Sequence, residues 1–270
     1  PAMPDGLLLK TDKMLARKAD GIGTMTFNNP ERRNAVSMEM WEAAETILTD
    51  FRDDPAVRVI VVTGAGDKAF VSGADISKFE SERNSMEDVK RYNDQTARVY
   101  DLLYDLPKPT IAQIKGYCVG GGAALAVCCD LRICGEDSRF AIPAAKLGLG
   151  YGFTGMKRLA DIVGPAFAKE ILFTARMFDA EEARIMGLIN RVVAKDQVEP
   201  TVAEYARTIC ENAPLTVSAA KQILNETQRD AGARDMAKVD ALVAGCFASE
   251  DYKEGRRAFM EKRKPNFQGR

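Results

Sequence analysis

The sequence of 270 residues contains no histidine. This absence excludes Ser-His and Cys-His nucleophile pairs, a histidine general base and a histidine-ligated metal. Acid–base chemistry in this chain must therefore use Asp, Glu, Tyr, Lys, Cys or water. The six cysteines lie mostly in apolar patterns and show no C-x-x-C spacing. We therefore expect reduced, buried thiols rather than disulfides or a redox pair.

An excess of one charge and long apolar runs are also missing. The formal net charge is −1, so the composition gives no electrostatic footprint for nucleic acid or an anionic membrane. No apolar run is long enough to cross a bilayer, and residues 1–10 lack the basic and apolar regions of a secretory signal. We expect a cytoplasmic protein that binds neither nucleic acid nor membrane. A cleaved organelle presequence would leave the same mature sequence.

Two glycine-rich turns, 70–76 (FVSGADI) and 116–125 (GYCVGGGAAL), are the most informative feature present. Each follows a β-like apolar run and opens into a segment with a helical pattern. Such turns leave backbone N–H groups free and let a ligand approach the main chain closely. Two turns aimed at one point would form a two-donor pocket for a developing oxyanion. The alternative is two tight strand-to-helix connections with no further role.

The pattern along the chain predicts strands and helices first and helices alone afterwards. Ser37 is the expected N-cap of one helix and Ser85 of another, and Pro109 ends the second. We expect strands at 7–17, 21–27, 57–63, 69–71, 110–114 and 131–134, and helices at 37–51, 85–106 and 122–129. From residue 154 onward the pattern predicts almost only helix, with boundaries near 164–165, 178–179, 187, 213–214 and 250. This order indicates a ββα-type core with a helical extension, and no linker divides it into two domains.

Two more segments, 29–35 (NPERRNA) and 254–267 (EGRRAFMEKRKPNF), lie before and after the glycine-rich turns in the sequence. Together the four motifs resemble the crotonase (enoyl-CoA hydratase/isomerase) superfamily, from about residue 7 to residue 267. The resemblance implies one α/β domain, with a spiral of ββα turns over about 1–195 and a helical trimerisation and CoA-covering region over about 196–270. It also implies an acyl-CoA thioester substrate, no separate cofactor or metal, and a homotrimer that can pair into a hexamer.

The resemblance also assigns site residues. The oxyanion donors would be the backbone N–H groups of Ala74 and Gly121, and the helix that Gly121 opens would add its positive dipole end. Phe259 and Lys262 would reach CoA from a neighbouring subunit, although the segment alone is also typical of a terminal helix with a solvated basic face. The remaining contacts to CoA or the acyl group would come from Arg32, Arg33, Ser72, Ala74, Asp75, Ile76, Gly121, Ala124, Pro143 and Ala144. From its place in the turn, Asp75 is expected to cap the following helix.

The acid–base residues depart from the family pattern. Hydratases of the superfamily carry two glutamates, and the matching positions here hold Ala124 and Ala144. Water addition needs one group to activate water and one to protonate the α-carbon, and methyl groups do neither. The two-glutamate mechanism is therefore not available, even though a similarity search would return the label enoyl-CoA hydratase.

Tyr151 is the best replacement candidate, because it lies in a glycine-flanked loop just before a helix. Family decarboxylases of methylmalonyl-CoA are similar in carrying a tyrosine at the matching position. Its hydroxyl could bind a substrate carboxylate or donate a proton, or the ring could simply pack the loop. Lys146 and Tyr117 are weaker candidates. The same loop matches the pattern G-x-G-x-x-G, but a poor strand precedes it, which argues against nicotinamide binding.

Two functions remain open from the sequence. The first is an acyl-CoA enzyme that stabilises a thioester enolate without the glutamate pair, by decarboxylation, isomerisation, retro-aldol cleavage, C–C hydrolysis or an atypical hydration. Decarboxylation needs no general base, but the decarboxylase relatives carry a histidine where this chain has Ala74. The second is a catalytically silent protein that binds CoA thioesters.

Overall fold

The computed structural model describes residues 6–270, except for the side chains of Ile76 and Phe79. It contains one six-stranded sheet in the order β1-β2-β3-β5-β7-β10 and one four-stranded sheet in the order β4-β6-β8-β9. The large sheet consists of β1 (Met14–Ala19), β2 (Ile22–Phe27), β3 (Val59–Gly64), β5 (Thr110–Ile114), β7 (Leu131–Gly135) and β10 (Arg191–Val193). The small sheet consists of β4 (Ala69–Val71), β6 (Tyr117–Val119), β8 (Arg139–Ala141) and β9 (Phe178–Asp179).

Eleven α-helices follow or cover these strands over residues 6–270. In chain order they are α1 (Met38–Asp53), α2 (Phe79–Glu82), α3 (Met86–Asp105), α4 (Gly121–Cys128), α5 (Ala144–Leu147), α6 (Phe153–Thr174), α7 (Ala180–Met186), α8 (Val198–Glu211), α9 (Pro214–Thr227), α10 (Met236–Phe247) and α11 (Glu250–Met260). Four 3₁₀ turns complete the set: η1 (Pro30–Arg32), η2 (Ile76–Lys78), η3 (Lys195–Gln197) and η4 (Ala231–Ala233). Ser37 and Ser85 cap α1 and α3 by accepting backbone N–H bonds, as predicted.

The strands and helices repeat as ββα units. β3, β5 and β7 are parallel neighbours in the large sheet, and β4, β6 and β8 are parallel neighbours in the small one. Each unit adds one strand to each sheet and then turns into a helix. This confirms the expected spiral of ββα turns. It also places the ends of β4 and β6, where the two glycine-rich turns begin, next to each other.

Both faces of the large sheet are covered, which explains why β3 and β5 are buried along their whole length. On one face the main core includes α1, α3 and α4, with Trp41, Leu103 and Leu125 among its buried side chains. On the other face, Val202 and Ala206 of α8 pack against the sheet. The site-bearing turns are therefore attached to a rigid, doubly covered scaffold.

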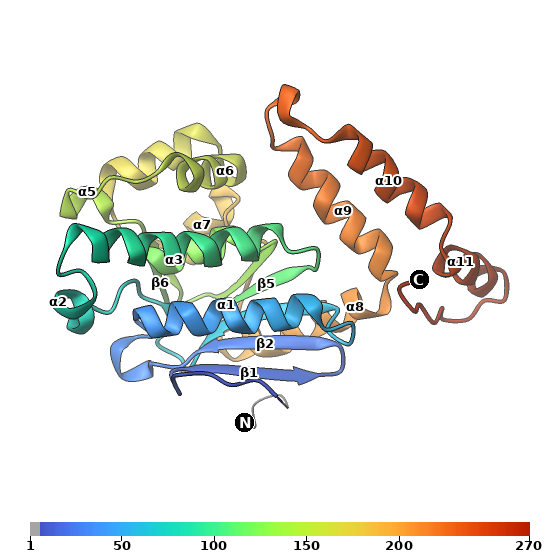
Figure 1. Ribbon diagram of the computed structural model, residues 1–270, viewed down its shortest axis with the longest axis horizontal. Helices are drawn as coiled ribbons and strands as arrows, with labels where there is room; N and C mark the ends of the chain where they lie inside the picture. Colours follow the sequence, from blue (N-terminus) through green and yellow to red (C-terminus); the bar gives the residue numbers. More distant parts are fainter. Residues whose placement is uncertain (1–5) are drawn as a thin grey trace.

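Helices α9, α10 and α11 project from this core to one side, with α11 at the far end (Figure 1). Polar contacts anchor the projecting arm: the Lys221 ammonium lies 3.0 Å from the Asp130 carboxylate, and Asn225 donates to the Tyr104 carbonyl. Within the arm, Leu224, Phe247 and Phe259 are more than half exposed. Over residues 6–270, no helix is both apolar and long enough to cross a membrane.

Three details differ from the sequence-based expectations. The first strand begins at Met14 rather than residue 7, because the Thr11 hydroxyl accepts the Lys13 N–H and forms a turn there. The two short strands β9 and β10 interrupt the region that was expected to be almost all helix. The second glycine-rich segment, 116–125, contains the short strand β6 before it reaches α4, and the first opens into η2 before α2.

Candidate active site

The two glycine-rich turns meet in the structure. A Cβ atom at Gly73 would lie 3.9 Å from the Gly121 backbone nitrogen, and one at Gly121 would lie 3.7 Å from the Gly73 Cα. Gly73 has φ +112° and Gly120 has φ +58°, so both turns use backbone conformations that favour glycine. Residues 48 apart in the sequence therefore border one small space.

The N–H of Ala74 points away from the main-chain ladder. Val36 forms a parallel bridge with Ala74: the Val36 N–H donates to the Gly73 carbonyl at 2.9 Å, and the Asp75 N–H donates to the Val36 carbonyl at 3.0 Å. In extended backbone, successive N–H groups point to opposite sides, so the Ala74 N–H faces the other way. It has no acceptor within residues 6–270.

Gly121 supplies a second N–H because it is the first residue of α4. The first N–H groups of a helix have no partner inside the helix. They also lie at the positive end of the helix dipole, which favours negative charge there. Gly121 and Ala124 are partly exposed, while the next residues of α4 are buried. This end of α4 therefore presents free donors to the space between the turns.

The loop before α1 borders the first turn. The Arg32 guanidinium lies 4.0 Å from the Asp75 carboxylate, and the Ser72 hydroxyl donates to the Arg32 carbonyl at 3.4 Å. The guanidinium of Arg33 lies over the Tyr117 ring, 4.8 Å from its centroid. Two exposed guanidiniums thus stand beside the turn, where an anionic ligand would meet them.

Asp75 is buried and acts as a cap. Its carboxylate accepts the Ser77 N–H at 3.1 Å and the Ser77 hydroxyl at 2.6 Å, which confirms the capping role expected from the sequence. Ile76 begins η2, and its side chain lies outside the described part of the chain.

Ala124 and Ala144 are both partly buried. The Gly120 N–H donates to the Ala141 carbonyl at 2.8 Å, which brings the start of α5, with Pro143 as its N-cap, toward the second turn. No carboxylate stands at either alanine. Lys146, two residues further on, is exposed.

Tyr151 packs against the main core beside α6, and its ring lies against Gly155. Burial raises the pKa of Tyr151 to about 12, with a further rise from the nearby Cys128 thiol. The pKa of Tyr100 is raised mainly by burial, and Tyr151 contributes to that rise. Within residues 6–270, the Tyr151 hydroxyl has no hydrogen-bond partner among protein atoms. Tyr151 is thus a neutral phenol with its proton available.

Comparison with known proteins identifies the scaffold. The model of the enoyl-CoA hydratase/isomerase family matches residues 17–270. The chain belongs to this family. It is 37% identical to a crotonyl-CoA hydratase of Syntrophomonas wolfei, over 95% of this chain and 98% of the relative. It is 34% identical to a short-chain-enoyl-CoA hydratase of Clostridium acetobutylicum, over 95% of this chain and 97% of that relative. A solved enoyl-CoA hydratase/isomerase family protein of Hyphomonas neptunium superposes with a TM-score of 0.91 at 36% identity, covering 96% of this chain and 98% of that one.

These similarities confirm the crotonase resemblance and the fold that it implied. The G-x-G-x-x-G pattern around Tyr151 is not part of a nucleotide-binding βαβ unit, because the helix α5 and not a strand precedes it. Over residues 6–270, no group of three or more Cys, Asp and Glu residues is arranged to hold a metal ion.

Two of the expected contacts lie apart from the turns. Phe259 is in α11 and Lys262 follows it, at the far end of the projecting arm (Figure 1). Phe259 is 82% exposed. Figure 1 draws α11 and α2, the helix that follows the first turn, on opposite sides of the molecule.

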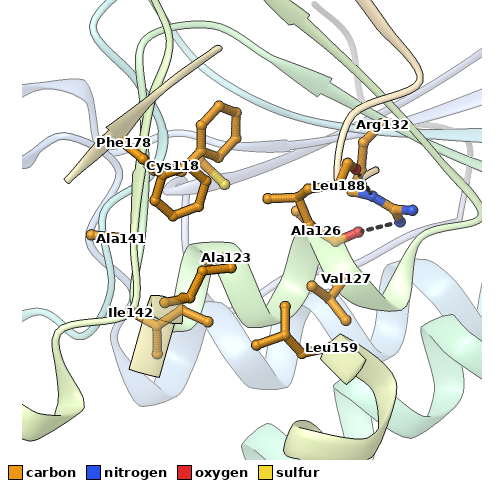
Figure 2. A pocket seen from close by; sticks show the side chains of 12 residues that line it. Cys118, Ala123, Ala126, Val127, Arg132, Ala141, Ile142, Leu159, Phe178 and Leu188 are labelled. Atoms are coloured by element: carbon orange, nitrogen blue, oxygen red, sulfur yellow. Dashed lines mark hydrogen bonds between the residues drawn. The ribbon is translucent and has the colours of Figure 1, made fainter. Parts of the chain in front are cut away.

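Beneath α4 the core contains a small apolar cavity of about 10 Å³ (Figure 2). A cavity of this size holds at most about one water molecule, so it is not an acyl pocket. Ala123, Ile142 and Leu159 are among its lining residues. Beside it, the buried Arg132 guanidinium donates to the Ala126 and Cys129 carbonyls and so caps the negative end of α4.

Sequence reasoning did not find Arg132 or Tyr100. Tyr100 lies in the C-terminal half of α3, and its hydroxyl donates to the Gly121 carbonyl at 3.0 Å. The only available signal was its spacing, eight residues after Tyr92 on the helix face that also carries buried Val99 and Leu103. A tyrosine at such a position is usually interpreted as core, and only the fold shows what its hydroxyl reaches.

Proposed function

We propose that this chain is an acyl-CoA enzyme that holds a thioester carbonyl oxygen between the N–H groups of Ala74 and Gly121. The observation that carries the proposal is the meeting of two free backbone donors at one space, with one of them at a helix N-terminus. When the α-carbon loses a proton or CO₂, the carbonyl oxygen gains negative charge. Pre-aimed donors stabilise that charge without reorganisation.

The same geometry orients the rest of the substrate. Arg32 and Arg33 are exposed beside the first turn, where they suit the phosphates of CoA. Ser72, Asp75, Ile76 and Pro143 would then border the pantetheine and thioester as part of the turns. The acyl group would point toward Ala124, Ala144 and Tyr151. The relatives named crotonyl-CoA and short-chain-enoyl-CoA hydratase favour a short acyl chain.

Methyl groups at positions 124 and 144 leave the site without the glutamate pair. Without that pair, the reaction that suits this site is one in which a bond of the substrate breaks and its electron pair forms the enolate. In decarboxylation the carboxylate leaves as CO₂, its bonding pair forms the enolate, and the α-carbon then takes a proton from Tyr151 or water. Loss of CO₂ is therefore the first reaction to test, ahead of isomerisation, retro-aldol cleavage, C–C hydrolysis and atypical hydration.

Mass spectrometry of a thioester panel tests this proposal. The panel contains crotonyl-, 3-enoyl-, methylmalonyl-, ethylmalonyl- and β-ketoacyl-CoA. We expect loss of CO₂ from a 2-carboxyacyl thioester. Gain of water would instead show a hydratase with substitute groups. Binding of the thioesters without any chemical change would favour the second candidate, a silent CoA-thioester binding protein, which the two alanines also fit.

The substitution Tyr151→Phe is expected to lower kcat/KM for the reaction found in the panel about 10-fold to 100-fold, which is the effect of losing a hydrogen bond to a charged group. Because the pKa of Tyr151 is raised to about 12, its phenol stays protonated at and below pH 9. The part of the rate that depends on this hydroxyl should thus be constant between pH 6 and 9. Steady-state rates of both proteins across that range measure it, and equal rates would remove Tyr151 from catalysis.

The projecting arm is proposed as an oligomerisation surface, in which Phe259 and Lys262 of one subunit approach CoA in another. Exposed apolar residues on α9, α10 and α11 would be covered in such an assembly. Light scattering is expected to give three or six times the 29.6 kDa mass of the chain. A monomer would contradict the assembly and the roles of Phe259 and Lys262.

A further inference from the structure

The second turn is attached to helix α3 through Tyr100. The Tyr100 hydroxyl donates to the Gly121 carbonyl at 3.0 Å. A Cβ atom at Gly121 would lie 3.3 Å from the same hydroxyl and 3.7 Å from the Gly73 Cα. Tyr100 therefore binds the carbonyl of the residue whose N–H is the proposed donor, on the side that faces the first turn.

The first turn is attached to the same helix through Tyr92. The Tyr92 hydroxyl donates to the Val36 carbonyl at 3.2 Å, and that carbonyl also accepts the Asp75 N–H. Since Val36 bridges to Ala74 on both sides, Tyr92 fixes the strand segment that sets the direction of the Ala74 N–H.

Trp41 of α1 joins the two tyrosines. Its indole N–H donates to the Tyr92 hydroxyl at 3.0 Å, and its ring meets the Tyr100 ring edge-to-face at 5.5 Å between centroids. Trp41 and Tyr92 are almost fully buried. Tyr92 and Tyr100 lie eight residues apart on one helix, about 12 Å along its axis. Three hydrogen bonds and one ring contact thus connect the two turns through α3 and Trp41.

We propose that Tyr92 and Tyr100 are positioning residues that set the separation and direction of the two oxyanion donors. The inference rests on the proposed function, because it assigns a role relative to the Ala74 and Gly121 N–H groups. Neither hydroxyl needs to touch the substrate. Each holds a peptide group in place, and donors of this kind act only when they are preorganised.

Burial raises the pKa of both phenols, so each remains a neutral donor at ordinary pH. Replacing either tyrosine by phenylalanine keeps the ring and its packing and removes only the hydrogen bond to the peptide. The effect should then fall on the transition state, in which the oxygen carries charge, more than on thioester binding.

The test uses the intact protein and 4-(dimethylamino)cinnamoyl-CoA, an enoyl thioester whose absorption moves to longer wavelength when its carbonyl is polarised. We expect a red shift on binding to the native protein. Tyr100→Phe should remove about half of that shift, the share of one of two donors. The dissociation constant of the Tyr100→Phe variant for this thioester should stay within about threefold of the native value. For any reaction found in the panel, kcat should fall about tenfold with little change in KM.

Tyr104→Phe is the matched control. Tyr104 lies on the same helix and is also partly buried, but its ring stacks on the Arg158 guanidinium at 4.4 Å instead of reaching either turn. We expect its red shift and kcat to equal those of the native protein. Thermal unfolding of each variant shows that the fold is retained.

The outcomes separate the two proposals. A native protein that binds the chromophore without a red shift would overturn the proposed function. A native red shift that Tyr100→Phe and Tyr104→Phe both retain in full would overturn the positioning role alone. If Tyr100→Phe does not fold, Tyr92→Phe decides in the same assay, because its hydroxyl reaches the other turn.

Discussion

The double substitution Ala124→Glu with Ala144→Glu is expected to raise the rate of water addition to crotonyl-CoA by about 10³-fold or more. By the resemblance noted in the sequence, these positions match the two hydratase glutamates, of which one would activate water and the other would protonate the α-carbon. A positioned general acid or base contributes roughly 10²-fold to 10⁴-fold. The proposed donors at Ala74 and Gly121 would hold the thioester carbonyl, and Ala124 and Ala144 are only partly buried, so the new side chains have access to water.

Loss of the crotonyl-CoA absorption on hydration measures this rate. The control is Ala124→Gln with Ala144→Gln, which adds side chains of the same size without a base. Each single glutamate should give much less than the pair, because hydration needs both groups. A folded double variant that binds crotonyl-CoA yet hydrates it no faster than the glutamine control would show that residues 124 and 144 do not face the substrate.

The sequence predicted the scaffold well because the scaffold depends on local patterns. The β-branched run around Val61 became a fully buried strand, and the serines at 37 and 85 cap the helices as expected. The glycine-rich turns were recognisable because the main chain itself needs glycine where φ is +112° at Gly73 and +58° at Gly120.

Other parts of the site depend on contacts between residues far apart in the sequence. Tyr100 binds a carbonyl 21 positions away, and Tyr92 binds one 56 positions away. Arg132 was not recognised because its partners, the last carbonyls of α4, become neighbours only after the chain turns into β7. The short strands β9 and β10 were missed for the same reason, since pairing with β8 and β7 defines them more than their own composition does.

Replacing Gly122 by alanine is expected to lower the free energy of unfolding by at least about 3 kcal/mol, at the upper end of the usual cost of overpacking. A Cβ atom at Gly122 would overlap the carbonyl oxygen of Val71, which belongs to the backbone of β4. A flexible side chain could rotate away, but two pieces of regular backbone must separate. The three consecutive glycines thus have different roles: Gly120 allows the positive φ, Gly121 leaves the space before Tyr100 open, and Gly122 lets α4 touch β4.

Denaturant unfolding of Gly122→Ala, with Gly232→Ala as control, measures this effect. Gly232 lies in η4, far along the chain from the turns, and a Cβ atom there meets nothing within 4 Å. The control should therefore be as stable as the native protein or slightly more so, because alanine restricts the unfolded chain. Because the clash separates α4 from β4, Gly122→Ala should also displace the Gly121 N–H from the Ala74 N–H. Any folded fraction should then lack the red shift of the bound chromophore. A stable Gly122→Ala protein with the native red shift would show that the approach of α4 to β4 does not set the distance between the two donors.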